Sequence, residues 1–185
     1  EAAKRAIDFD PTNLQASTIL GDLAFENKRY LEATKHYELI ADRADSIDKK
    51  DAARILVRFV DALSQSGSTE KALAPMDTLL RIAPDDVEAI GRVAQVTFEH
   101  GSPQRAAELY RDLLDRFGAQ LKGKERATAL YRYGEALRKA GELDEAIKHL
   151  EESSELDPSS SAPLAALSKV YEGKEQWEKA LKIKT

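Results

Sequence analysis

Residues 130–158 of this chain, which decide its fold, have the sequence LYRYGEALRKAGELDEAIKHLEESSELDP. Apolar and small residues recur there at the i, i+3, i+4, i+7 spacing of one helix face. The first set is Leu130, Tyr133, Gly134 and Leu137, and the second set is Leu143, Ala146, Ile147 and Leu150. Gly141 separates the sets and favours a helix end, while Pro158 disfavours helical geometry in the residue before it. The stretch therefore predicts two amphipathic helices joined by a tight turn.

The same hairpin pattern recurs along nearly the whole chain, and two columns of small residues define it. The second helices share an alanine at positions Ala33, Ala72, Ala106, Ala146 and Ala180. The first helices carry a residue that is small in four of five cases: Gly21, Val60, Ala94, Gly134 and Ser168. Small side chains let two helices approach closely. We therefore expect these columns to mark where the paired helices touch.

This repeated unit resembles the tetratricopeptide repeat, a pair of antiparallel helices of about 34 residues. The resemblance extends from Leu14 to Ala180 and implies an all-α fold, a right-handed α-solenoid (superhelix) of antiparallel helix hairpins. We expect one array over residues 1–185. Residues 1–11 are expected to end a preceding repeat, and the last of the following repeats to be incomplete. The expected repeats are 14–45, 53–84, 87–118, 127–158 and 161–185.

The spacing of the alanine column alternates, with steps of 39, 34, 40 and 34 residues. The extra residues fall around positions 42–51 and 117–126, where we expect longer connections or extended second helices. A polar terminal repeat, as arrays normally have, is missing from the pattern at both ends. We therefore expect the chain to be a piece of a longer array, with any signal, anchor or catalytic domain outside it.

Composition excludes several classes of function. The 185 residues include 28 Lys+Arg and 33 Asp+Glu, and the net charge of −5 argues against a general nucleic-acid binder. No apolar run approaches the ~18–20 residues that a membrane span needs. The chain has no cysteine, which excludes disulfides and thiolate metal sites but leaves the compartment open. The cytoplasm is slightly favoured.

No motif in the chain predicts catalysis, a metal site or a cofactor. His36 and His149 occupy one column beside core positions, so we expect both to face solvent, and neither has metal-ligand spacing. The segment from Gly118 to Lys124 has the spacing of a phosphate loop. However, Glu125 stands where that loop needs Ser or Thr, and the segment follows a helix instead of a strand. We expect no enzymatic activity from this chain.

The candidate binding residues come from the first helices, which line the concave inner surface in tetratricopeptide arrays. One column there holds arginines in three successive repeats, and a companion column holds mainly polar residues. Forked guanidinium groups suit the carboxylates of an acidic peptide. Tyr131 is a further candidate, because it lies off the apolar face of its helix. The predicted groove residues are Arg54, Arg58, Arg92, Gln95, Tyr131, Arg132 and Glu135.

A simpler explanation for these arginines is pairing within their own helices. Arg58 with Asp61, and Arg132 with Glu135, would form i, i+3 pairs on a solvated surface. Arg92 faces Gln95 and lacks such a local partner on its own helix, which favours ligand contact in that repeat.

The sequence thus leads to three hypotheses about function. The first is a non-catalytic protein-interaction scaffold that binds a peptide segment of a partner in its concave groove. The second is a regulatory or substrate-recruiting arm of a larger enzyme whose catalytic domain lies outside this chain. The third is a self-assembling scaffold whose uncapped ends expose apolar surface.

Overall fold

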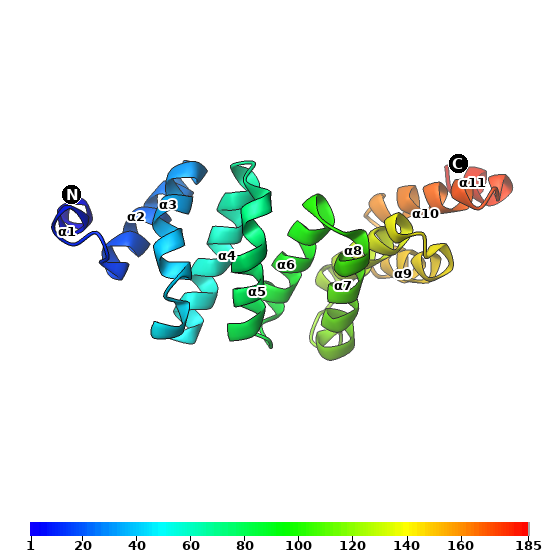
Figure 1. Ribbon diagram of the computed structural model, residues 1–185. Helices are drawn as coiled ribbons and strands as arrows, with labels where there is room; N and C mark the ends of the chain where they lie inside the picture. The colour runs from blue at the N-terminus through cyan, green and yellow to red at the C-terminus, as the bar shows by residue number, and fades with distance from the viewer. Residues whose placement is uncertain (185) are drawn as a thin grey trace. The chain divides into compact units, whose positions relative to one another are not determined.

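The computed structural model describes residues 1–184, and within that range it consists of α-helices, two short 3-10 helices and connecting turns (Figure 1). The elements are α1 Ala2–Phe9, α2 Leu14–Glu26, α3 Tyr30–Ala41, η1 Ala44–Ser46, α4 Lys49–Gln65, η2 Thr69–Ala72, α5 Leu73–Ile82, α6 Val87–His100, α7 Pro103–Phe117, α8 Lys124–Ala140, α9 Leu143–Leu156, α10 Ala162–Gly173 and α11 Trp177–Lys184.

Local sequence explains several helix starts. The side chain of Asn13 accepts a hydrogen bond from the Ala16 amide at the start of α2, and Asp48 caps α4 in the same way. Ser102 caps α7, whose first residue is Pro103. Polar side chains are favoured there because they satisfy backbone N–H groups that have no partner within the helix, and proline has no N–H to satisfy.

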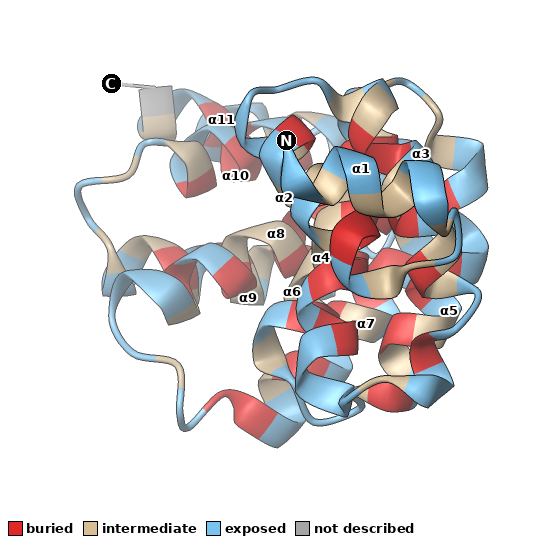
Figure 2. Cartoon of the chain, turned by 90° about the vertical axis from the view of Figure 1, so that its left-hand side faces the viewer, coloured by how far each residue is buried: buried red, intermediate tan, exposed pale blue. Residues whose placement is uncertain are grey.

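The chain divides into two compact units, Glu1–Val96 and Thr97–Thr185, with the division inside α6. In the first unit α2 packs against α3, α3 against α4, and α4 against α5. In the second unit α7 packs against α8, α8 against α9, α9 against α10, and α10 against α11. Sequential helices are thus spatial neighbours. Buried residues form stripes along helices that are otherwise exposed (Figure 2).

The two small-residue columns mark close helix contacts. The alanine column is buried throughout: Ala33, Ala72, Ala106 and Ala146 are 0% exposed, and Ala180 is 3% exposed. A Cβ added at Gly21 would lie 2.6 Å from Cε1 of Tyr37, and one at Gly134 would lie 2.6 Å from Cγ of Leu150. The ring and the leucine occupy the space that a larger residue would need. The predicted role of these columns is confirmed.

In several hairpins the turn between the two helices contains a residue with a left-handed backbone conformation. This residue lies five positions before the alanine of the buried column. The φ angles are +76° at Gly67 and +90° at Gly141, and also +59° at Lys28 and +57° at Glu175. Glycine tolerates this conformation because it has no Cβ. The same geometry is strained for the lysine and the glutamate.

The extra residues of the longer spacings lie largely in longer connections, the first of the two expected alternatives. They do not extend the second helices, since α3 ends at Ala41 and α7 ends at Phe117. They form the segment containing η1 and the loop 118–123, and they also lengthen the following first helices. Helices α4 and α8 have 17 residues each, compared with 13 in α2 and 12 in α10. The capping side chain of Asp48 allows α4 to begin this early.

Candidate binding site

The side chain of Asp22 joins three helices in the first unit. From α2 it accepts a hydrogen bond from the Tyr37 hydroxyl of α3 at 2.8 Å. It also contacts Nη1 of Arg54 at 3.1 Å and Nη1 of Arg58 at 2.9 Å, both on α4. Burial and the adjacent Asp22 carboxylate together raise the pKa of Tyr37, so its hydroxyl stays protonated as a donor. The guanidinium of Arg58 also lies over the Phe25 ring, 5.6 Å from its centroid.

Arg92 of α6 repeats this relationship one hairpin later. Its Nε lies 3.1 Å from Oδ1 of Asp61 on α4, and its Nη1 donates to Oε1 of Gln95 at 3.2 Å. An arginine on one first helix therefore binds the carboxylate on the preceding first helix, in both cases. Arg92 faces Gln95 as expected, and its charged partner is Asp61 on the preceding first helix.

These pairs run between helices and not along one helix, as the alternative explanation had them. Arg58 pairs with Asp22 of α2, and Asp61 pairs with Arg92 of α6. We call these residues, Asp22, Arg54, Arg58, Asp61, Arg92 and Gln95, the first-helix polar line.

The second unit shows a different arrangement. Glu135 of α8 is 9% exposed and receives two hydrogen bonds from Arg138 of the same helix, at 2.7 and 3.1 Å. Arg138, a residue outside the predicted groove set, thus holds the Glu135 carboxylate with its fork. Ala166 occupies the arginine column on α10, so the next helix offers no guanidinium to Glu135.

Tyr131 lies half-buried on α8, with a pKa that burial raises. It lines a hollow of about 40 Å³ together with Thr128, Asp157 and Ser160, which is large enough for a water molecule but not for a peptide side chain. Arg132 is half-exposed. The structure therefore brings together Arg54, Arg58, Arg92 and Gln95 in the first unit. The other predicted groove residues, Tyr131, Arg132 and Glu135, lie in the second unit.

Sequence reasoning missed the role of Asp22 and Asp61 as partners across helices, and missed Arg138 altogether. The arginine column and the adjacent carboxylate column could have indicated the pairs across helices. The i, i+3 spacing of Glu135 and Arg138 could have indicated their pair, since such residues are neighbours on a helix surface.

The partial exposure of the first-helix polar line determines what it can bind. The side chains of Arg54, Arg58 and Arg92 are 45%, 30% and 33% exposed. Each guanidinium has five N–H donors in a fixed fork, and a single aspartate oxygen can use only some of them. The pairs thus hold the arginines in position while part of each guanidinium faces solvent.

The histidines differ from expectation in one respect. His149 is half-buried, and its ring centroid lies 4.5 Å from that of Tyr133. Burial lowers the pKa of His149 and of His36. The prediction that both face solvent is wrong, because their column lies at the edge of the helix contact.

No group of three or more His, Asp or Glu side chains within residues 1–184 is close enough to hold a metal ion. None of the helices described has the length and apolarity required to cross a bilayer.

Comparison with known proteins agrees with this architecture. A family model described as tetratricopeptide repeat matches residues 92–161. A crystal structure of MamA protein has 18% identity and a TM-score of 0.76, with 92% of this chain and 87% of that chain covered. MamA from Desulfovibrio magneticus RS-1 has 17% identity and a TM-score of 0.77, with 92% and 90% covered.

Tetratricopeptide-like repeats of a putative kinesin light chain from Podosopora anserina have 17% identity and a TM-score of 0.73, with 94% and 92% covered. The comparison with curated protein sequences found no match. Residues 92–161 thus match the tetratricopeptide-repeat family, and the fold class of the chain is an all-α helical-repeat solenoid. Such folds generally serve as protein-interaction scaffolds.

Proposed function

We propose that this protein is a non-catalytic scaffold that binds an extended, acidic peptide segment of a partner protein along its first helices. The family resemblance implies that these helices line the concave surface of the array. The observation that carries the proposal is the first-helix polar line, in which Arg58 and Arg92 are each held by a carboxylate of the preceding first helix.

Pre-positioned arginines favour binding for an energetic reason. A flexible arginine loses side-chain entropy when it grips a ligand, whereas one already held by an aspartate loses less. Its remaining N–H groups can bind a peptide carboxylate or backbone carbonyl. The Asp22 and Asp61 charges offset part of the positive potential, so we expect recognition by directed hydrogen bonds with a moderate dependence on salt.

The test uses Arg58→Lys and Arg92→Lys together, which keep both charges but remove the fork. Peptides from the partner would be identified by affinity capture with the full chain, and their binding measured by calorimetry. We expect the double variant to bind on the order of tenfold more weakly, a loss of ~1.4 kcal/mol. The double variant Arg58→Ala and Arg92→Ala should bind more weakly still and lose most of the salt dependence.

Arg116→Lys is the matched control, because Arg116 pairs with Asp112 on the second helix α7. Circular dichroism would establish that all variants remain folded. Unchanged binding in the double variant, or an equal loss in the Arg116 control, would rule out the first-helix polar line as the binding surface.

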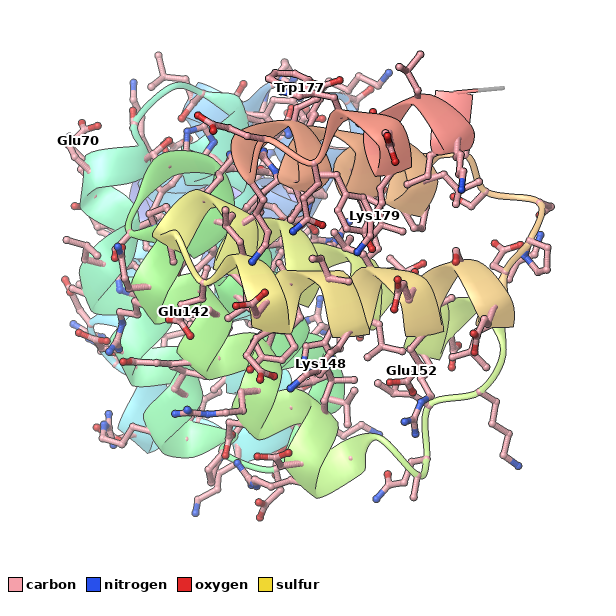
Figure 3. The ribbon with its side chains drawn as sticks, turned by 90° about the vertical axis from the view of Figure 1, so that its right-hand side faces the viewer. Glu70, Glu142, Lys148, Glu152, Trp177 and Lys179 are labelled. Atoms are coloured by element: carbon pink, nitrogen blue, oxygen red, sulfur yellow. The ribbon has the colours of Figure 1, made fainter. Side chains whose placement is uncertain are left out.

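Self-association through α10 and α11 is a second candidate that one observation favours. Trp177 and Leu181 on α11 are 59% and 63% exposed, and Leu164 on α10 is 40% exposed. Figure 3 labels Trp177. Exposed apolar side chains favour association. Sedimentation velocity over a range of concentrations tests it, since Trp177→Glu should then yield a smaller species than the wild type. A concentration-independent monomer contradicts it.

A further inference from the structure

An open hollow of about 660 Å³ lies in the first unit, at the turn between α2 and α3 and beside the end of α4. Lys28, Arg29 and Lys35 line it from the α2–α3 hairpin, and Gln65 and Ser66 line it from the end of α4. None of these residues belongs to the first-helix polar line.

The hollow is positively charged although the chain as a whole carries a charge of −5. Three cations line it, and Glu32 is the one carboxylate among its lining residues. Arg29 binds that carboxylate through Nη1 at 2.7 Å. A positive concavity on an acidic protein attracts anionic ligands selectively. Leu31, which also lines the hollow, is 63% exposed and offers an apolar contact.

The second unit contains the equivalent edge and shows that this charge is not a general property of the fold. Counting from the buried alanines Ala33 and Ala146, the positions of Lys28, Arg29 and Leu31 correspond to Gly141, Glu142 and Asp144. Three carboxylates and two lysines occupy that edge: Glu142, Asp144, Glu145, Lys148 and Lys174. Figure 3 labels Glu142 and Lys148 there.

A cross-hairpin ion pair bridges the equivalent edge but cannot form in the first unit. Nζ of Lys174 contacts Oδ1 of Asp144 at 2.5 Å, joining the end of α10 to the start of α9. The corresponding positions are Ser66 and Leu31, which cannot form an ion pair. The hollow in the first unit thus remains unbridged, with Leu31 exposed beside it.

Lys28 gives an independent indication, because it has a left-handed backbone with φ of +59°. Gly67 and Gly141 serve the same turn position without strain. A lysine there brings a positive charge to the hollow at a cost in stability that glycine avoids. Strained residues of this kind concentrate at functional sites.

We propose that this hollow docks an acidic peptide segment of a partner protein that carries an apolar residue among its carboxylates. The carboxylates pair with Lys28, Arg29 and Lys35, and the apolar side chain packs on Leu31. The site is distinct from the first-helix polar line, so one chain can engage two segments at once.

The probe is a short fluorescein-labelled peptide of Asp, Glu and Ser with one central leucine, measured by fluorescence anisotropy with the full chain. We expect saturable binding that weakens as salt rises. The variant Lys28→Gly with Lys35→Glu should bind on the order of tenfold more weakly. Lys28→Gly also relieves the backbone strain, so this loss cannot be attributed to unfolding. Replacing the leucine of the peptide by serine should weaken binding as well.

Lys148→Glu is the matched control, since Lys148 corresponds to Lys35 on the equivalent edge, and its binding should equal that of the wild type. The proposal is overturned if the Lys28 and Lys35 variant binds as tightly as the wild type, or if the control loses as much affinity. It is also overturned if the serine peptide binds equally well, or if only phosphatidylserine vesicles and not the peptide bind the chain. Retained peptide binding in the Arg58 and Arg92 variant would separate this site from the first-helix polar line.

Discussion

Nε of Arg92 lies 3.1 Å from Oδ1 of Asp61, and this ion pair joins the first helix α6 to the first helix α4. Arg58 and Asp22 join α4 to α2 in the same way, at 2.9 Å. The polar contacts thus run beside the apolar core from one first helix to the next. In a repeat protein, where each unit is stabilised mainly by its neighbours, such contacts add to the energy of the interface between repeats.

A double-mutant cycle on Arg92→Ala and Asp61→Ala measures this contribution. Both side chains are largely buried, at 33% and 20% exposure, so we expect a coupling free energy of about 0.5–1 kcal/mol in urea unfolding. The exposed pair of Arg116 and Asp112 within α7 is the control and should give ~0.3–0.5 kcal/mol. A coupling at Arg92 no larger than that of the control would contradict a role in joining the helices.

The close contact at Gly134 predicts opposite effects for two glycine substitutions in the second unit. Gly134→Ala places a Cβ 2.6 Å from Cγ of Leu150, and should lower the free energy of unfolding by about 1–3 kcal/mol. Gly173→Ala places its Cβ 3.9 Å from Cδ1 of Leu143, an ordinary contact, and should raise it by roughly 0.4–1 kcal/mol. Thermal and urea unfolding check both predictions. If Gly134→Ala also raised the free energy of unfolding, Leu150 would have to move away from the added Cβ.

The left-handed turns predict a stabilising substitution at Glu175. Its φ is +57°, so Glu175→Gly should raise the free energy of unfolding by about 1 kcal/mol. Gly141 adopts a φ of +90° with open space around its Cβ position, so Gly141→Ala should lower stability by about 1–2 kcal/mol through backbone strain alone. Equal stabilities of the Glu175 variant and the wild type would show that this turn relaxes without strain.

His149 predicts a dependence of stability on pH. Burial lowers its pKa in the folded protein, although Glu152, Glu145 and Asp115 oppose that shift and Lys148 adds to it. The unfolded chain therefore takes up the proton first as the pH falls through about 6.5, the ordinary value for histidine. Stability should fall from pH 7 toward pH 5 for this reason. His149→Phe should reduce the slope in urea unfolding, and an unchanged slope would assign the effect to other groups.

The sequence by itself determined the helical hairpins, the resemblance to the tetratricopeptide repeat and the positions where helices touch. The alanine column from Ala33 to Ala180 and the glycines at 21 and 134 were sufficient, because a helix period of 3.6 residues fixes which side chains share a face. Small residues recurring on facing stripes leave one way to bring the helices together. Local periodicity carries this information, and the sequence displays it directly.

Only the tertiary structure decided which charges pair and which remain exposed. Arg58 could bind Asp61 on its own helix or Asp22 on its neighbour, and the spacing along the chain is equally compatible with both. The choice depends on the distance between separate helices, as does the open hollow beside Lys28. Side chains far apart in sequence meet across a helix contact at distances that a one-dimensional pattern does not contain, which is why the candidate binding surfaces required the structure.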